Sequence, residues 1–236
     1  VDALFYEDPY DRLEKFVAKL PDYEKMRDYF ALDGTSLLSV FLRFGVLSPK
    51  EVFNYYRPQN GSEVFIQELF WREFYNTILY HFPESSQKNF NGKSIQFRNS
   101  LEDFKAWREG KTGVPLIDAA MIHFKNTGLM HNRLRMLVAS FLCKNLLIDW
   151  RWGEEYFAKT LLDYEASSNI GSWQWAASTG ADAVPYFRIF NPYTQSHKFD
   201  KEGVFIKSVI PELESLNPKL FHQENALKLQ DRRWRS

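Results

Sequence analysis

Apolar side chains recur along most of the chain at the three- and four-residue spacing of helices. This spacing predicts one helix over Val64 to Leu79, a second over Val114 to Asn126 and a third over Met130 to Leu147. A further helix follows Ser48, which is its candidate N-cap. Alternating strand patterns are absent from the sequence. The pattern therefore predicts an all-α fold, which we expect to form a single domain over residues 1–236.

Two long segments between the predicted helices have the character of loops. Glu84 to Ser100 is mostly polar and is expected to connect helices at the surface. Ser178 to Lys201 combines glycine and prolines with several aromatic residues, a mixture typical of functional loops. The longest apolar run, Leu137 to Trp150, is interrupted by Lys144 and other polar residues, so it predicts a buried helix and not a membrane span.

Composition and charge narrow the possible classes of protein. The 30 Lys and Arg residues balance 30 Asp and Glu residues, which argues mildly against a generic nucleic-acid binder but permits a local basic face. The single cysteine, Cys143, cannot form an internal disulfide and is typical of a reducing, cytoplasmic compartment. The five histidines lack metal-ligand spacing, so no metal is expected. No signal peptide is recognisable, and a chain that starts with Val1 is typical of a fragment or a processed product.

Three clusters place polar residues where core residues would be expected. The first is Glu68, Trp71, Arg72 and Tyr75, whose spacing puts all four on one helical face. One interpretation is a solvated face with a Glu68–Arg72 pair. The other is the wall of a pocket, in which the indole stacks on a flat ring and the charged groups bind its edges.

The second cluster is Asn132, Arg135 and Met136, again on one helical face, with Arg133 beside them. A solvated face is the simpler interpretation. Asparagine is a poor helix former, however, so a functional reason is worth considering for Asn132. Its amide can both donate to and accept from the edge of a heterocycle.

The third cluster runs from Asp163 through Glu165 and Asn169 to Trp173 and Trp175. Each tryptophan alone could simply fill the core. The combination of acids, a glycine-containing turn and two tryptophans around one glutamine is harder to explain by packing, and it indicates a binding site.

At these residues the sequence resembles the photolyase/cryptochrome family. The resemblance covers residues 23 to 211 in order, and it is carried by Gly34–Ser39, Glu68–Tyr75, Gly128–Met136, Asp149–Arg151, Trp173–Ala183 and Pro185–Pro192. It implies an all-helical FAD-binding domain and a monomer that acts on DNA in a bacterial-type cytoplasm. The α/β antenna domain that usually precedes this domain is missing from the sequence, so we expect either a fragment or a protein that dispenses with the antenna.

The resemblance also implies the residues that bind FAD. They are Tyr23, Thr35, Ser36, Leu37, Leu38, Ser39, Phe65, Arg72, Arg135, Asp163, Glu165 and Asn169. Hydroxyls and backbone N–H groups near a helix start suit the diphosphate. Arg135 and Asp163 are implied to form a buried ion pair beside the flavin, and Asn169 to lie near flavin N5. Glu165 stands where the family commonly has Asp, and Leu37 where a basic residue is frequent.

A second implied set faces the substrate. Catalytic contacts to a flipped pyrimidine dimer are implied for Glu68, Trp71, Asn132, Met136 and Trp175, and contacts to the DNA backbone for Arg27, Arg133, Arg188 and Gln195. The sequence has the repair-type residues Asn132, Met136 and Asn169, which makes it most similar to class I cyclobutane pyrimidine dimer photolyases. The expected reaction is blue-light-driven electron transfer from reduced FAD, which splits the dimer. The alternatives are a cryptochrome-type photoreceptor without repair activity and an inactive remnant.

The electron-transfer chain of the family is incomplete in this sequence. Trp173 and Trp150 match its inner and middle tryptophans, but the outer position falls at Phe97, which is a poor terminal donor. We therefore expect photoreduction to be slow or redirected, with Trp107 or Trp152 as substitute donors.

Overall fold

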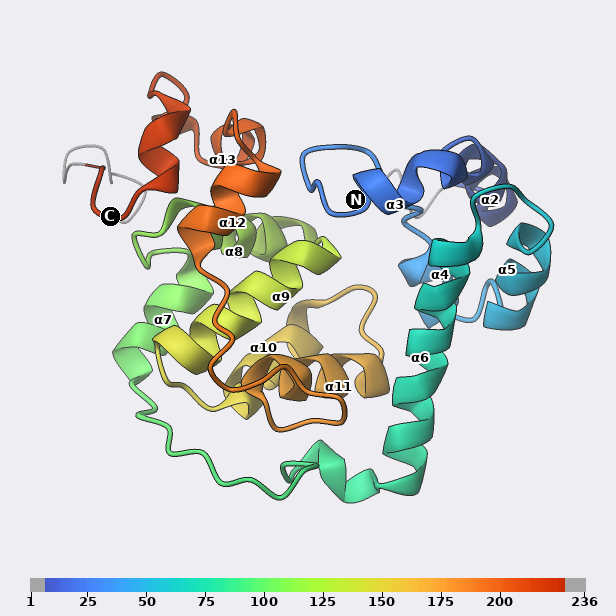
Figure 1. Cartoon of the computed structure of the whole chain (residues 1–236), viewed down its shortest axis with the longest axis horizontal. Coiled ribbons are helices and arrows are strands. Elements are labelled where there is room, and N and C mark those ends of the chain that lie inside the picture. Colours follow the sequence, from blue (N-terminus) through green and yellow to red (C-terminus); the bar gives the residue numbers. More distant parts are fainter. Residues whose placement is uncertain (1–6, 228–236) are drawn as a thin grey trace.

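The computed structural model describes residues 7–227 and is built from helices throughout, with no strand in that range (Figure 1). Its α-helices are α2 Pro9–Val17, α3 Tyr23–Met26, α4 Ser39–Arg43, α5 Pro49–Tyr56, α6 Glu63–His81, α7 Leu101–Glu109, α8 Pro115–Thr127, α9 Asn132–Ser140, α10 Trp150–Thr160, α11 Ala166–Ala177, α12 Pro192–Phe199 and α13 Val204–Val209. A π-helical turn, Phe141–Asn145, extends α9, and 3-10 helices cover Leu20–Asp22, Pro83–Ser86, Pro211–Leu213 and Pro218–His222. The predicted all-α class is confirmed.

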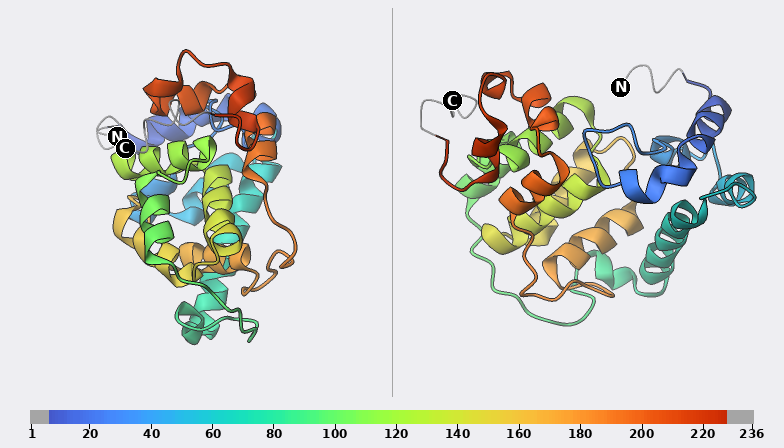
Figure 2. Two further views of the ribbon diagram at one scale, coloured as in Figure 1. Left: turned by 90° about the vertical axis from the view of Figure 1, so that its left-hand side faces the viewer. Right: turned by 45° about the horizontal axis from the view of Figure 1, so that its top comes forward.

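The helices pack around two separate hydrophobic clusters. The smaller one joins α2 to α5 and the start of α6, where the rings of Phe16, Tyr23, Tyr56 and Phe65 pack edge to face or tilted. The larger one takes in α7 to α13 and is centred on α8, α9 and α11. In the right-hand view of Figure 2 the blue N-terminal helices and the red C-terminal helices lie at opposite ends of the molecule. Helix α6 runs from the smaller cluster toward the larger one.

Two glycines let the helices around α11 approach closely. A Cβ on Gly171 would overlap the ring of Tyr75 on α6, and a Cβ on Gly153 of α10 would overlap the ring of Trp173. Helix α11 makes its closest packing with these same two neighbours, α10 and α6. The glycines therefore set the spacing of three helices that carry predicted site residues.

The local predictions are mostly confirmed. Ser48 caps α5 in a complete capping box with Glu51. The helix predicted over Val114 to Asn126 is α8, which ends at the left-handed Gly128. The helix predicted over Val64 to Leu79 is α6.

Two predictions were wrong in part. The long loop predicted over Ser178 to Lys201 ends at Asn191, because the Asn191 side chain caps α12 and Pro192 occupies its first turn. The buried helix predicted through the apolar run to Trp150 stops after the π-helical turn, where Leu147 has φ of 55°. The chain then restarts as α10, which Asp149 caps. The sequence also has a short basic stretch near its end, Asp231 to Arg235, which lies outside the described residues.

None of the helices within residues 7–227 has the length and apolarity needed to cross a bilayer. In the same range no group of three or more His, Cys, Asp or Glu side chains could hold a metal ion.

Candidate functional site

The pair Arg135–Asp163 joins α9 to the segment before α11. Arg135 Nη2 donates to both carboxylate oxygens of Asp163, at 3.0 and 2.8 Å, and Arg135 Nε donates to the Met130 carbonyl at 2.8 Å. The Asp163 side chain is only 4% exposed, against 30% for Arg135. The predicted ion pair is therefore present, with its carboxylate buried and the guanidinium partly open.

Glu165 is the N-cap of α11. Its carboxylate accepts from the backbone N–H groups of Ser167 and Ser168, at 3.1 and 2.9 Å, and from both serine hydroxyls. Burial works against the charged form, but these hydrogen bonds outweigh it and lower the pKa of Glu165. In addition, Ser167 Oγ contacts Asn76 Oδ1, which links the cap to α6. Both carboxylate oxygens of Glu165 are thus hydrogen-bonded to the first turn of α11.

Asn169 lies one turn further along α11 and is held by α10. Its Nδ2 donates to Glu154 Oε1 at 3.0 Å, while Tyr164 OH reaches the same carboxylate oxygen at 3.4 Å. Burial raises the pKa of Glu154, and the two hydrogen bonds only partly counteract it. Glu154 is a residue that the sequence did not single out, because an acid within the charged helix α10 carries no local signal of a buried partner.

Glu68 forms its ion pair with Arg27, at 2.7 Å, so the alternative pairing with Arg72 is wrong. The Arg27 guanidinium also lies over the ring of Tyr23, 5.3 Å from its centroid. Burial raises the pKa of Tyr23 to about 12, so the phenol stays neutral. Arg27, predicted to bind DNA, therefore contacts both Glu68, predicted to bind the substrate, and Tyr23, predicted to bind FAD.

The turn from Thr35 to Ser39 leads into α4. Leu37 has φ of 55° and is 40% exposed, a conformation that costs a leucine about 1 kcal/mol or more. Ser36 Oγ accepts from the Leu38 N–H at 3.4 Å. Among residues 7–227, the side chains of Thr35, Ser39 and Arg72 have no hydrogen-bond or ion-pair partner. The hydroxyls of Thr35 and Ser39 and the guanidinium of Arg72 are hydrogen-bond donors of the kind that bind a diphosphate.

The aromatic residues predicted to hold the substrate are partly open. Trp71 is 42% exposed and packs on Phe74 and Tyr75 of its own helix. Trp175, on α11, stacks on Phe190 at a centroid separation of 6.2 Å. Asn132 and Met136 both lie on α9, exposed and half-buried respectively. These residues come from three helices, and no hydrogen bond or ring contact in the described part of the chain joins them directly.

Besides Arg27, at the end of α3, the residues predicted to contact the DNA backbone lie on α9 and around α12. Arg133 pairs with Asp28 at 2.5 Å and lies over the ring of Phe199. Arg188 is exposed, and Gln195 Oε1 is buried without a hydrogen-bond partner in the structure.

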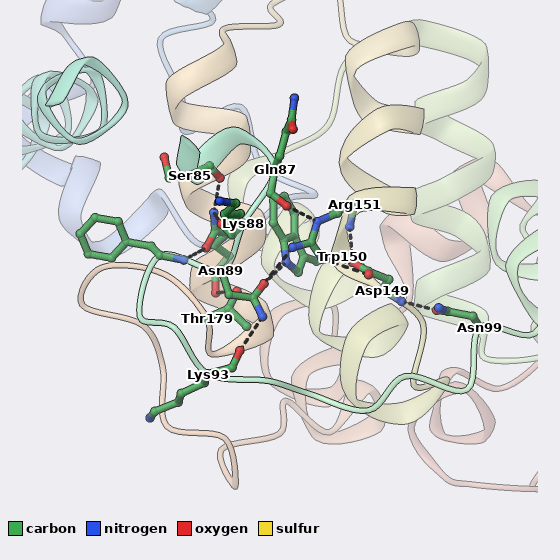
Figure 3. Close-up of polar contacts among 12 residues, drawn as sticks. Ser85, Gln87, Lys88, Asn89, Lys93, Asn99, Asp149, Trp150, Arg151 and Thr179 are labelled. Atoms are coloured by element: carbon green, nitrogen blue, oxygen red, sulfur yellow. Dashed lines mark hydrogen bonds and ion pairs between the residues drawn. The ribbon is translucent and has the colours of Figure 1, made fainter. Parts of the chain in front are cut away.

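The surroundings of the two predicted electron-transfer tryptophans differ. Trp173 contacts Trp107 at a ring separation of 6.1 Å, edge to face. Trp150 is fully buried, donates through Nε1 to Asn89 Oδ1 at 2.9 Å, and has Arg151 over its ring (Figure 3). Phe97 packs against the edge of the larger cluster.

A surface hollow lined by Tyr10, Ser48, Lys50 and Tyr55 lies between α2 and α5. None of the predicted site residues lines this hollow. The charged, amide and aromatic side chains predicted to bind ligands lie instead mainly on α3, α6, α9 and α11.

Sequence comparisons identify relatives of known name. The family described as the FAD binding domain of DNA photolyase matches residues 65–235. The deoxyribodipyrimidine photo-lyase of Escherichia coli is 48% identical over 212 residues, which cover 86% of this chain and 45% of the relative. That of Alkalihalophilus pseudofirmus is 43% identical over 228 residues, covering 94% and 48%. The chain thus spans about half the length of the curated relatives it matches.

Solved structures agree with these relatives. A bacterial class III photolyase from Agrobacterium tumefaciens has a TM-score of 0.88 at 43% identity, covering 94% of this chain and 48% of that one. A cryptochrome from Synechocystis has a TM-score of 0.87 at 34% identity, covering 96% and 50%. The helical arrangement and the sequence matches together mean that this chain belongs to the photolyase/cryptochrome family, as an FAD-binding domain of the DNA photolyase type.

Proposed function

We propose that this chain binds FAD and belongs to a deoxyribodipyrimidine photo-lyase that repairs cyclobutane pyrimidine dimers in DNA. The observation that carries the proposal is the joint presence of Glu68, Trp71, Asn132, Met136 and Trp175 on α6, α9 and α11, in a chain 48% identical to a photo-lyase. Reduced FAD, when bound, supplies the light-excited electron. The class I assignment rests on Asn132, Met136 and Asn169 and is part of the proposal, as is action on bacterial DNA in the cytoplasm.

The donor set supports FAD binding by the residues around α4, α6 and α11. Arg72 and the hydroxyls of Thr35 and Ser39 would hold the diphosphate, while Arg135 would lie beside the isoalloxazine ring. Tyr23 and Phe65 contact each other at 5.6 Å and would form an apolar wall. Asn169, held by Glu154, would orient its amide toward the flavin.

The substrate residues have separate tasks in this proposal. Trp71 and Trp175 would pack on the two faces of the flipped bases and exclude water from them. Glu68 would hydrogen-bond the edge of the dimer, so its ion pair with Arg27 would loosen as the dimer enters. Arg27 and Arg133 would then exchange their carboxylate partners for phosphates, which keeps both guanidinium groups paired throughout.

Repair of defined DNA tests the proposal. The FAD-loaded protein is reduced with dithionite, mixed with oligothymidine containing dimers and irradiated with blue light, and recovery of thymine absorbance is followed. We expect recovery with the native protein and a reduced yield with Glu68→Ala. Glu73→Ala is the matched control, because Glu73 is an exposed acid on the same helix. No recovery with FAD bound would refute the repair activity.

The alternative function is that of a cryptochrome-type photoreceptor without repair. It is supported by the similarity to the Synechocystis cryptochrome, whose identity of 34% is lower than that of the photo-lyases. A photoreceptor has no need for all five substrate residues. The same assay separates the two, because a photoreceptor would show light-dependent flavin changes without thymine recovery.

We propose that, during photoreduction of bound FAD, electrons reach Trp173 from Trp107 and not from the outer position of the chain, where Phe97 stands. Trp107 touches Trp173, and Tyr156, which is half-buried, lies 5.9 Å from Trp107. Trp152 is linked to Trp107 only through Phe104. We expect Trp107→Phe to slow photoreduction and Phe97→Trp to accelerate it, as measured by flavin absorbance under blue light with an external reductant. Fast reduction that depends on Phe97 alone would contradict this route.

A further inference from the structure

Lys144 is a charged residue inside the most apolar stretch of the chain. It lies on the π-helical turn after α9 and is only 7% exposed. No carboxylate among the described residues pairs with its ammonium group. Burial lowers the pKa of Lys144, and the nearby Arg188 charge lowers it further. A buried cation that lacks an anionic partner is costly, so its few hydrogen bonds call for an explanation.

Those hydrogen bonds go to the two ends of one tight turn. Lys144 Nζ donates to the Arg188 carbonyl at 2.9 Å and to the Pro185 carbonyl at 3.4 Å. The turn itself is closed by a hydrogen bond from the Arg188 N–H to the same Pro185 carbonyl, at 2.9 Å. The two residues between these ends, Tyr186 and Phe187, are 54% and 85% exposed.

The turn has few other contacts to fix it. It belongs to the segment between α11 and α12, drawn in orange in Figure 1. Val184, just before the turn, is 3% exposed, and Phe190, just after it, stacks on Trp175. These contacts anchor the flanks, whereas the conformation of the turn depends on its own closing hydrogen bond and on Lys144.

We infer that Lys144 is a positioning residue: by donating to both ends of the turn Pro185–Arg188 it clamps the turn in one conformation and so preorganises it for DNA. This inference rests on the proposed function, in which Arg188 contacts the DNA backbone. A turn held in one conformation presents the Arg188 guanidinium and the two exposed rings together, without an ordering cost at the moment of binding. DNA phosphates would also offset the repulsion between the Lys144 and Arg188 charges.

Two variants of Lys144 in the FAD-loaded protein test the clamp. Lys144→Met keeps the length and apolar stem but removes the donors, whereas Lys144→Arg keeps a charged donor. We expect Lys144→Met to weaken binding to dimer-containing DNA by about tenfold, because the turn would have to be ordered on binding. The repair yield per bound dimer should stay unchanged, and Lys144→Arg should recover part of the affinity. A purely structural role would instead lower FAD content in the Met variant and show no recovery with Arg.

Hydrogen exchange tests the turn independently of DNA. The Arg188 amide should be protected in the native protein and should exchange faster in Lys144→Met. An unprotected Arg188 amide in the native protein would overturn the inference even if the variant failed to fold. Faster exchange with unchanged DNA affinity would overturn the role in DNA binding. If the native protein does not prefer dimer-containing DNA, the proposed function fails, while the exchange measurement still decides whether the clamp exists.

Discussion

Helices α6 and α8 are both rich in apolar residues, yet they are used in opposite ways. Eight of the 13 residues of α8 are buried, including Met121 and Phe124. In α6 only Phe65 is buried among 19 residues, while Phe70, Trp71 and Tyr80 are 61%, 42% and 82% exposed. A helix that is apolar on all sides is normally covered on all sides. Helix α8 follows this rule, whereas α6 mixes polar residues with apolar side chains that stay exposed.

The difference separates residues that stabilise the fold from residues that the proposed function uses for binding. Helix α8 lies at the centre of the larger cluster, where its neighbours on α7, α9 and α13 bury it. Helix α6 packs on α11, and it carries Glu68, Trp71 and Arg72, three residues of the proposed site. Within the proposed function, Trp71 on α6 is therefore expected to matter for ligands, and the buried apolar residues of α8 for stability.

The largest effect should come from the core of α8. Phe124 is fully buried and lies 4.5 Å from Phe157, so Phe124→Ala should cost about 3–5 kcal/mol of unfolding free energy. Phe70→Ala removes the same side chain from an exposed position on α6 and should cost no more than about 0.5–1 kcal/mol. Urea unfolding of both variants gives the comparison. Equal losses would show that α6 is as structural as α8.

The next effect should appear in binding and not in stability. Trp71→Ala should weaken the affinity for dimer-containing DNA by about 1–3 kcal/mol, the range for loss of one aromatic stacking surface. Tyr80→Ala is the control, because Tyr80 is a more exposed aromatic residue on the same helix. Binding is measured with labelled DNA in the dark. A similar loss from both variants would contradict a specific role for Trp71.

Close packing of α6 on α11 can be tested at Gly171. The new Cβ of Gly171→Ala would overlap the Tyr75 ring, and overpacking of this kind costs about 1–3 kcal/mol. The cost should fall when Tyr75→Leu makes room for the methyl group, which a double-mutant cycle measures. An unchanged cost in the Tyr75→Leu background would mean that the two residues do not compete for space.

The smallest effect concerns the helix starts. Helix α8 begins without a side-chain cap, whereas His131 Nδ1 caps α9 by accepting from the Arg133 N–H at 3.1 Å. His131→Ala should cost about 1 kcal/mol, whereas His131→Asn should retain the cap.

Burial also lowers the pKa of His131 to about 4, from 6.5. The folded state therefore holds the neutral imidazole, and its contribution to the free energy of unfolding is fully present above pH 6.5. It is lost as the pH falls from 6.5 to about 4, because the unfolded chain binds the proton first. His131→Asn should flatten the stability profile in this window, as followed by urea midpoints. A profile unchanged by the substitution would assign the acid sensitivity to another group.

The sequence alone determined most of the local structure and the family. Apolar spacing located α6 and α8, while Ser48 and Gly128 marked helix ends, because caps and periodicity act within a few residues. The start of α12 at Asn191-Pro192 carried a similar signal, which the aromatic residues around it obscured. The motifs around Glu68, Asn132 and Trp173 were enough to predict the family.

Only the tertiary structure decided the partners of the site residues. Glu68 pairs with Arg27 and not with Arg72, Asn169 is held by Glu154, and Lys144 reaches Arg188. Each of these contacts joins residues that lie 15 or more positions apart, and each forms only because the packing of the helices brings the two residues together. Local propensity carries no information about such pairings, so the polar contacts of the proposed site came from the fold.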